Sequence, residues 1–137
     1  MNKINWIIIA CFIVSATFWL ADPNELSAKY LAFSTTNLLN GRVWTLITAL
    51  FLHADIFHLA GNMIFLYAFG NVLEKEVGPG KTFLAFFAGG IISLLLGVLF
   101  YNPNVYLVGA SAAIFTLTAV VMLVKPSSPS SSLCLSG

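Results

Sequence analysis

Four apolar segments, each close to the length that crosses a bilayer, constrain this chain more than any other feature. They cover residues 4–21, 56–73, 82–100 and 105–124. A spanning helix needs about 20 predominantly apolar residues, with a range near 17–25. Because backbone polar groups must be paired inside lipid, we expect an all-α fold, a polytopic helical bundle in a membrane.

The composition excludes a soluble globular domain and a nucleic-acid-binding protein. Only 8% of the residues are charged, whereas about a quarter are charged in typical soluble domains. The net charge of +1 provides no basic surface for nucleic acid. Cys11 and Cys134 fall in an apolar segment and a polar tail, which indicates no disulfide framework. Residues 17–22 make no small-x-small cleavage site, so we expect the first segment to be a retained membrane anchor.

The basic residues predict an orientation in the membrane. Four of the six would lie on the side of the N-terminus, and the positive-inside rule then places that side in the cytoplasm of a cell-membrane protein. On this topology the second and fourth segments both begin at the outer face. The side of the N-terminus would carry Lys3, Lys75, Lys81 and Lys125, and the other side Lys29 and Arg42.

We expect two parts, a transmembrane domain over residues 1–125 and a tail over residues 126–137. Within the first part, residues 22–55 are too long for a simple turn and mix apolar with polar side chains, which predicts an interfacial element. The tail is Ser-rich without apolar periodicity, which predicts disorder. Its abrupt change in character raises the hypothesis that the reading frame ends prematurely.

The second apolar segment contains polar side chains that are expensive in lipid. An imidazole or carboxamide at that depth usually faces a protein interior or a wet cavity. His58 and Asn62 are four positions apart, so on a helix they share one face, one turn apart. His53 lies five positions before His58, which favours a place just before the helix. A lone histidine in such a segment most often only bridges helices.

Ser111 lies in Gly109-Ala110-Ser111-Ala112, near the start of the fourth segment. A serine there is most often a helix cap or a packing residue. A nucleophile would need a base to take its proton and donors where the oxyanion develops. His58, Asn62 and the Ser111 backbone offer such donors, and Gly109 would allow a close approach by a substrate.

These pieces together resemble the rhomboid family of intramembrane serine proteases, from about Arg42 to Lys125. The ordered conjunction is specific, whereas a lone Gly-x-Ser is not. The matching residues are 41–48 (GRVWTLIT), 51–53 (FLH), the spacing of His53, His58 and Asn62, 70–74 (GNVLE), 78–81 (GPGK) and 109–115 (GASAAIF).

The resemblance implies a catalytic role for Ser111, which would attack a peptide carbonyl of a transmembrane protein near the outer face. It implies that His58 and Asn62, with the Ser111 amide, form the oxyanion hole. No metal or other cofactor is expected.

The resemblance also implies supporting roles near the site. His53 and Glu74 would be structural, tying the outer loop and the helix ends. Gly109 would be the small residue beside the serine, and Phe115 would take the place of an aromatic that stacks on the catalytic histidine.

The family has six helices and a general-base histidine on the sixth, whereas this chain has four apolar segments. His53 and His58 are its only histidines, and both match positions with other roles. A serine without a base is a weak nucleophile, so the 137-residue form is expected to be nearly inactive alone. The alternative is a rhomboid-like pseudoprotease that binds membrane clients without cutting them.

A third possibility is a haem or metal site on His53 and His58. Imidazoles bind such ions, but a five-residue spacing does not suit one helical site. Asp55 is the only nearby carboxylate.

Overall fold

The computed structural model describes residues 2–21 and 26–124, and this part of the chain is mostly helical. The Ser-rich tail and its predicted disorder lie outside the described residues. The elements are α1 (Ile4–Ala21), α2 (Leu26–Leu31), α3 (Thr35–Leu39), α4 (Thr45–Thr48), α5 (Ile56–Phe65), the π-helical turn η1 (Leu66–Gly70), α6 (Asn71–Val77), α7 (Pro79–Gly97) and α8 (Ser111–Val124).

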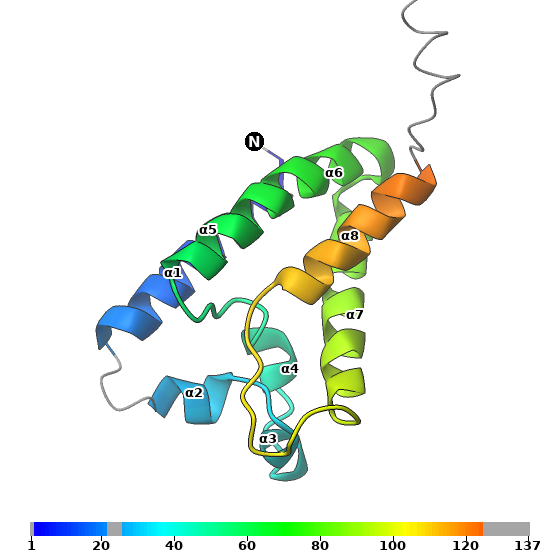
Figure 1. Ribbon diagram of the computed structural model, residues 1–137. Coiled ribbons are helices and arrows are strands. Elements are labelled where there is room, and N and C mark those ends of the chain that lie inside the picture. The colour runs from blue at the N-terminus through cyan, green and yellow to red at the C-terminus, as the bar shows by residue number, and fades with distance from the viewer. Residues whose placement is uncertain (1, 22–25, 125–137) are drawn as a thin grey trace, which may run out of the picture.

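Three helices in the described residues are long and apolar enough to cross a membrane, and the predicted helical bundle is confirmed. They are α1, the continuous helix Ile56–Val77 formed by α5, η1 and α6, and α7. The continuous helix runs beside α1, and α8 lies alongside the continuous helix at the front of the view (Figure 1). The first predicted segment has the observed bounds, whereas the second helix continues four residues further and the third begins three residues earlier.

The predicted start of the fourth segment at residue 105 is wrong, because α8 begins only at Ser111. Residues before it do not form a helix but pair with the predicted outer loop, the segment between α1 and α5 that the structure describes over residues 26–55. The Phe33 N–H donates to the Leu107 carbonyl at 3.1 Å, and the Leu107 N–H donates to the Phe33 carbonyl at 2.7 Å. These two bonds satisfy backbone groups that a helix would otherwise have used.

Small residues bring α7 and α8 together. A side chain at Gly89 would collide with Thr116, and one at Gly90 would lie 2.8 Å from the Leu50 side chain and 3.3 Å from the Ala113 methyl group. The close approach therefore depends on glycine at both positions. It fixes α8, and with it Ser111, against the rest of the bundle.

Glu74 joins the far end of the continuous helix to α1. Its buried carboxylate accepts hydrogen bonds from the Lys3 N–H at 2.8 Å and the Ile4 N–H at 2.9 Å. These amides belong to the first turn of α1, where the helix supplies no acceptor and a negative charge is favoured. Gly78, with φ 90°, then ends α6.

The outer loop is an ordered set of short helices bonded to the α7–α8 connection. The Trp44 indole N–H donates to the Tyr30 carbonyl, and the Thr48 hydroxyl to the Leu31 carbonyl. Thr36 donates from its backbone and from its hydroxyl to the Pro103 carbonyl. Apolar side chains of this loop are exposed at Leu39, Val43, Trp44 and Ile47. The predicted interfacial position of the loop stays a prediction.

Candidate active site

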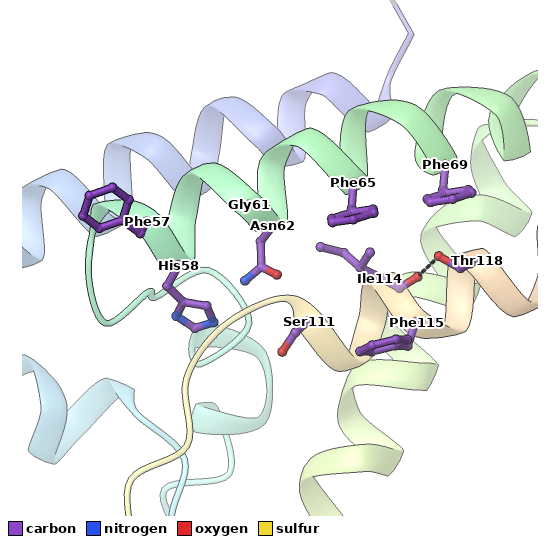
Figure 2. Close-up of a pocket in the computed structure, with 10 residues that line it drawn as sticks. All are labelled: Phe57, His58, Gly61, Asn62, Phe65, Phe69, Ser111, Ile114, Phe115 and Thr118. Atoms are coloured by element: carbon purple, nitrogen blue, oxygen red, sulfur yellow. Dashed lines mark hydrogen bonds between the residues drawn. The ribbon is translucent and has the colours of Figure 1, made fainter.

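The start of α5 fixes the first two residues of the candidate site. The Asp55 carboxylate accepts the His58 N–H at 2.8 Å as an N-terminal cap, so the helix begins at Ile56. His53 therefore precedes the helix, as predicted. His58 and Asn62 project from one face of α5 toward the start of α8, where Ser111 lies (Figure 2).

The hydrogen bond to His58 decides which of its ring nitrogens carries the proton. The Ala54 N–H donates to Nδ1 at 3.3 Å, so in the neutral ring the proton is on Nε2. A Cβ on Gly109 would lie 2.6 Å from Cε1 and 2.9 Å from Nε2 of His58. This edge of the ring therefore rests against the glycine two residues before Ser111.

Asn62 supplies a second donor at the same place. Its Nδ2 is buried and makes no hydrogen bond within the described structure, and it lies 3.7 Å from where a Gly109 Cβ would be. A buried donor without an acceptor costs about 1–3 kcal/mol. Such an exception needs an explanation, and an acceptor supplied by a bound ligand is one.

Ser111 is the first residue of α8. At this end of the helix, the Ile114 N–H donates to the Ala110 carbonyl at 2.9 Å. The Ser111 amide therefore precedes the first turn and has no acceptor within the helix. The positive end of the helix dipole adds to its attraction for an oxyanion.

Gly109 makes the turn into α8 possible. Its φ of 111° lies in the left-handed region that favours glycine. Its N–H donates to the Ala49 carbonyl at 2.8 Å, which ties this turn to the outer loop. The backbone thus reverses beside His58 and Asn62 and presents Ser111 to them.

A cavity of about 460 Å³ opens between α5, η1 and α8 at this point. Ser111, His58 and Asn62 form its polar end, and the rest is mainly aromatic and aliphatic, apart from Thr118, whose hydroxyl donates to the Ile114 carbonyl. Phe115 lines the cavity with 76% of its surface exposed, and its predicted stacking role stays a prediction. The remaining lining residues are Phe57, Gly61, Phe65, Phe69, Ile114 and Thr118 (Figure 2).

His53 connects α1 to the segment that carries Ser111. The Ala110 N–H donates to Nε2 of His53 at 3.4 Å, so Nε2 is unprotonated and the neutral ring carries its proton on Nδ1. Nδ1 lies 3.2 Å from the Ser15 hydroxyl oxygen and 3.3 Å from the Phe51 carbonyl. The Ser15 hydroxyl in turn donates to the Phe51 carbonyl at 3.0 Å.

This network works only with a neutral His53. A proton on Nε2 would face the Ala110 N–H, and both groups are donors. Burial and then the neighbouring His58 lower the pKa of His53 from 6.5 to about 4, against the opposing effect of the Phe51 carbonyl. The two imidazole rings meet edge to face, 5.1 Å between centroids.

The structure does not bring Glu74 to the site. It lies 16 positions after His58 on the continuous helix, roughly 24 Å along the axis at about 1.5 Å per residue. The predicted position near the site is therefore wrong, although Glu74 does make a structural contact with α1.

Ser15 is a residue of the His53 network that the sequence did not predict. Its one signal is the spacing Ile4, Ile7, Cys11, Ser15, which places it on the buried face of α1.

Neither histidine offers Ser111 a proton acceptor. His58 presents an N–H on Nε2, and both nitrogens of His53 are engaged with Ser15, Phe51 and Ala110. The described residues contain no group of three His, Cys, Asp or Glu side chains that could hold a metal ion.

The fold defines a multi-pass helical membrane protein. The Rhomboid domain model matches residues 40–135, and the chain belongs to the rhomboid family. It is 39% identical over 131 residues to Rhomboid-like protein 11, chloroplastic, of Arabidopsis thaliana, covering 92% of this chain and 43% of that protein. It is 36% identical over 124 residues to Rhomboid-like protease 3 of Toxoplasma gondii, covering 83% and 45%.

Another relative carries a different description. The chain is 31% identical over 83 residues to Inactive RHOMBOID-like protein 8 of Arabidopsis thaliana, covering 61% of this chain and 23% of that protein. The chain spans less than half the length of each of these relatives.

Proposed function

We propose that this chain carries the nucleophile and oxyanion hole of an intramembrane serine endopeptidase of rhomboid type. Ser111 is the proposed nucleophile, and the donors are Nε2–H of His58, Nδ2–H of Asn62 and the Ser111 amide. The observation that carries the proposal is the buried, unpartnered Asn62 Nδ2 beside Gly109. A donor kept without an acceptor is what a site needs if the acceptor develops only during the reaction.

In the proposed reaction the Ser111 Oγ attacks the scissile carbonyl carbon, and the carbonyl electron pair moves onto oxygen. The three N–H groups then hold the resulting oxyanion. The hydroxyl proton has to leave at the same stage, and general-base help is typically worth about 10²–10⁴ in rate. Both histidines serve as described above, so the proposal requires a base other than these two side chains.

The apolar cavity supports a membrane-protein substrate. It opens beside Phe57 and Phe65, which are exposed side chains of α5, and an apolar segment of a spanning helix would fill it at little desolvation cost. We place the cut near the outer face of the cell membrane, with the N-terminus of this chain in the cytoplasm.

Labelling with a fluorophosphonate probe tests the proposal. We expect slow covalent labelling of the protein in isolated membranes, because the serine lacks a base, and at least tenfold less labelling of Ser111→Ala. Ser93→Ala is the matched control, since Ser93 lines the neighbouring cavity beside Ser111 and has no proposed role in the reaction. Undiminished labelling of Ser111→Ala would overturn the assignment.

The second candidate function is a pseudoprotease that holds membrane clients. It is favoured by the lack of a proton acceptor for Ser111 among the described residues and by the match to a relative described as inactive. In that case a client would co-purify at unchanged mass and Ser111→Ala would bind it equally well. An endopeptidase site instead predicts that Ser111→Ala traps an intact client that the original protein shortens.

A further inference from the structure

A second, polar cavity of about 460 Å³ lies away from Ser111, between the short helices of the outer loop and the α7–α8 connection. Two cationic side chains, Lys29 and Arg42, line it together with Asn40, Asn104 and Tyr106. No carboxylate of the described residues lines it. Among the lining residues that the structure describes, no negative charge compensates these two cations.

The Arg42 side chain is held in place before any ligand arrives. Its Nη1 donates at 2.8 Å to the Oδ1 of Asn37, an amide with 2% of its surface exposed. Asn37 is itself fixed, because its Nδ2 donates to the Ala32 carbonyl at 2.8 Å. The guanidinium carbon also lies 4.8 Å from the centroid of the Tyr30 ring. One bond orients the planar fork and leaves further N–H groups for a ligand.

Lys29 adds a second positive charge at the same aromatic ring. Its Nζ lies 5.5 Å from the Tyr30 centroid, within reach of a cation–π contact. Two cations next to one ring, with amide and phenol donors around them, form a site for a compact anion with several oxygens. A phosphate group fits, because a guanidinium binds its oxygens in pairs.

The surroundings of the cavity decide between a dissolved phosphate and a lipid. Val43, Trp44 and Ile47 are exposed by 60%, 48% and 48% in the adjoining α4 region. The Trp44 indole N–H donates to the backbone carbonyl of Tyr30, and the ring of Tyr30 lies beside both cations. Exposed apolar side chains with an indole at their edge are typical of the membrane interface. A dissolved phosphate would gain nothing from them, whereas acyl chains would cover them.

We propose that this cavity binds the phosphate group of an anionic phospholipid, with Arg42 and Lys29 on the phosphate oxygens and the acyl chains along Val43, Trp44 and Ile47. The site would anchor the outer loop, which is bonded through Phe33 and Leu107 to the segment before Ser111. This proposal does not depend on the catalytic one, since it uses none of the same side chains.

Native mass spectrometry of the detergent-purified chain with dioleoyl phosphatidylglycerol tests it. We expect one retained lipid, with affinity at least tenfold lower in Arg42→Gln and several-fold lower in Lys29→Gln. Lys81→Gln is the matched control, because Lys81 is exposed in the first turn of α7 and does not line this cavity. Dioleoyl phosphatidylcholine should bind at least several-fold more weakly, and millimolar inorganic phosphate should not displace the anionic lipid.

Several results would overturn the proposal. Equal binding of the two lipids would remove the role of the cations, and displacement by inorganic phosphate would identify a site for the free ion. If Arg42→Gln fails to fold because Asn37 loses its partner, Lys29→Gln decides alone. The Lys29 side chain is exposed, so an unchanged affinity in that variant contradicts the proposal.

Discussion

Gly109→Ala is expected to reduce fluorophosphonate labelling of Ser111 at least tenfold, to the background level of Ser111→Ala. A methyl group there would lie 2.6 Å from Cε1 and 2.9 Å from Nε2 of His58, too close for either atom to remain. The φ of 111° adds backbone strain, of order 1–3 kcal/mol for a non-glycine residue. Either His58 leaves the site or the turn before Ser111 changes, and both outcomes remove a donor from the oxyanion.

The variant Gly41→Ala separates the effect of backbone strain from the effect of a steric clash. Gly41 also has a positive φ, 84°, but a side chain there would meet nothing within 4 Å. We expect this variant to lose roughly 1–2 kcal/mol of stability and to keep its labelling. Two results would contradict this account: labelling of Gly109→Ala as fast as that of the original protein, or a loss of labelling no larger than in Gly41→Ala. In either case the site does not require the close contact between His58 and this turn.

Acid is expected to destabilise the fold through His53. Its pKa is about 4 in the folded protein against 6.5 ordinarily, so between these values the unfolded chain binds more protons. Stability is then fully present above pH 6.5 and is lost as the pH falls toward 4. One such group contributes a slope of at most about 1.4 kcal/mol per pH unit, less where water reaches the ring.

Unfolding free energies in detergent at several pH values between 7.5 and 4 measure this effect. The carboxylates also titrate in that range, so the informative quantity is the difference between the original protein and His53→Gln. We expect the difference to shrink as the pH falls, because neutral glutamine loses nothing to protonation. Parallel curves would mean that His53 is not held neutral by its contacts with Ser15 and Ala110.

The sequence was most informative where local chemistry decides the structure. The bounds of α1 follow from its apolar length, and the place of His53 follows from the Asp55 cap. The common face of His58 and Asn62 follows from helical geometry. The helix start at Ser111 was predicted only approximately, because the apolar pattern begins at residue 105 and does not reveal the positive φ of Gly109 that precedes the helix.

The remaining features depend on partners that are distant in the chain. Residues 105–110 are apolar enough for a helix, yet Leu107 pairs with Phe33, 74 positions earlier. The resemblance implied a place near the site for Glu74, but its carboxylate accepts the first amides of α1, 70 and 71 positions earlier in the chain. The bond from Ser15 to His53 joins α1 to the loop before α5, and no periodicity in either segment predicts it.

Cysteine cross-linking tests most directly whether the two helices meet at the serine. In a Cys11→Ala, Cys134→Ser background, Asn62→Cys with Ser111→Cys should be joined efficiently by a short bifunctional thiol reagent in membranes. Ile64→Cys with Ser111→Cys is the control, since Ile64 is 68% exposed and lies about 200° around α5 from Asn62. Efficient cross-linking of the first pair and little of the second is the predicted result. Equal or reversed yields would contradict the account of the site.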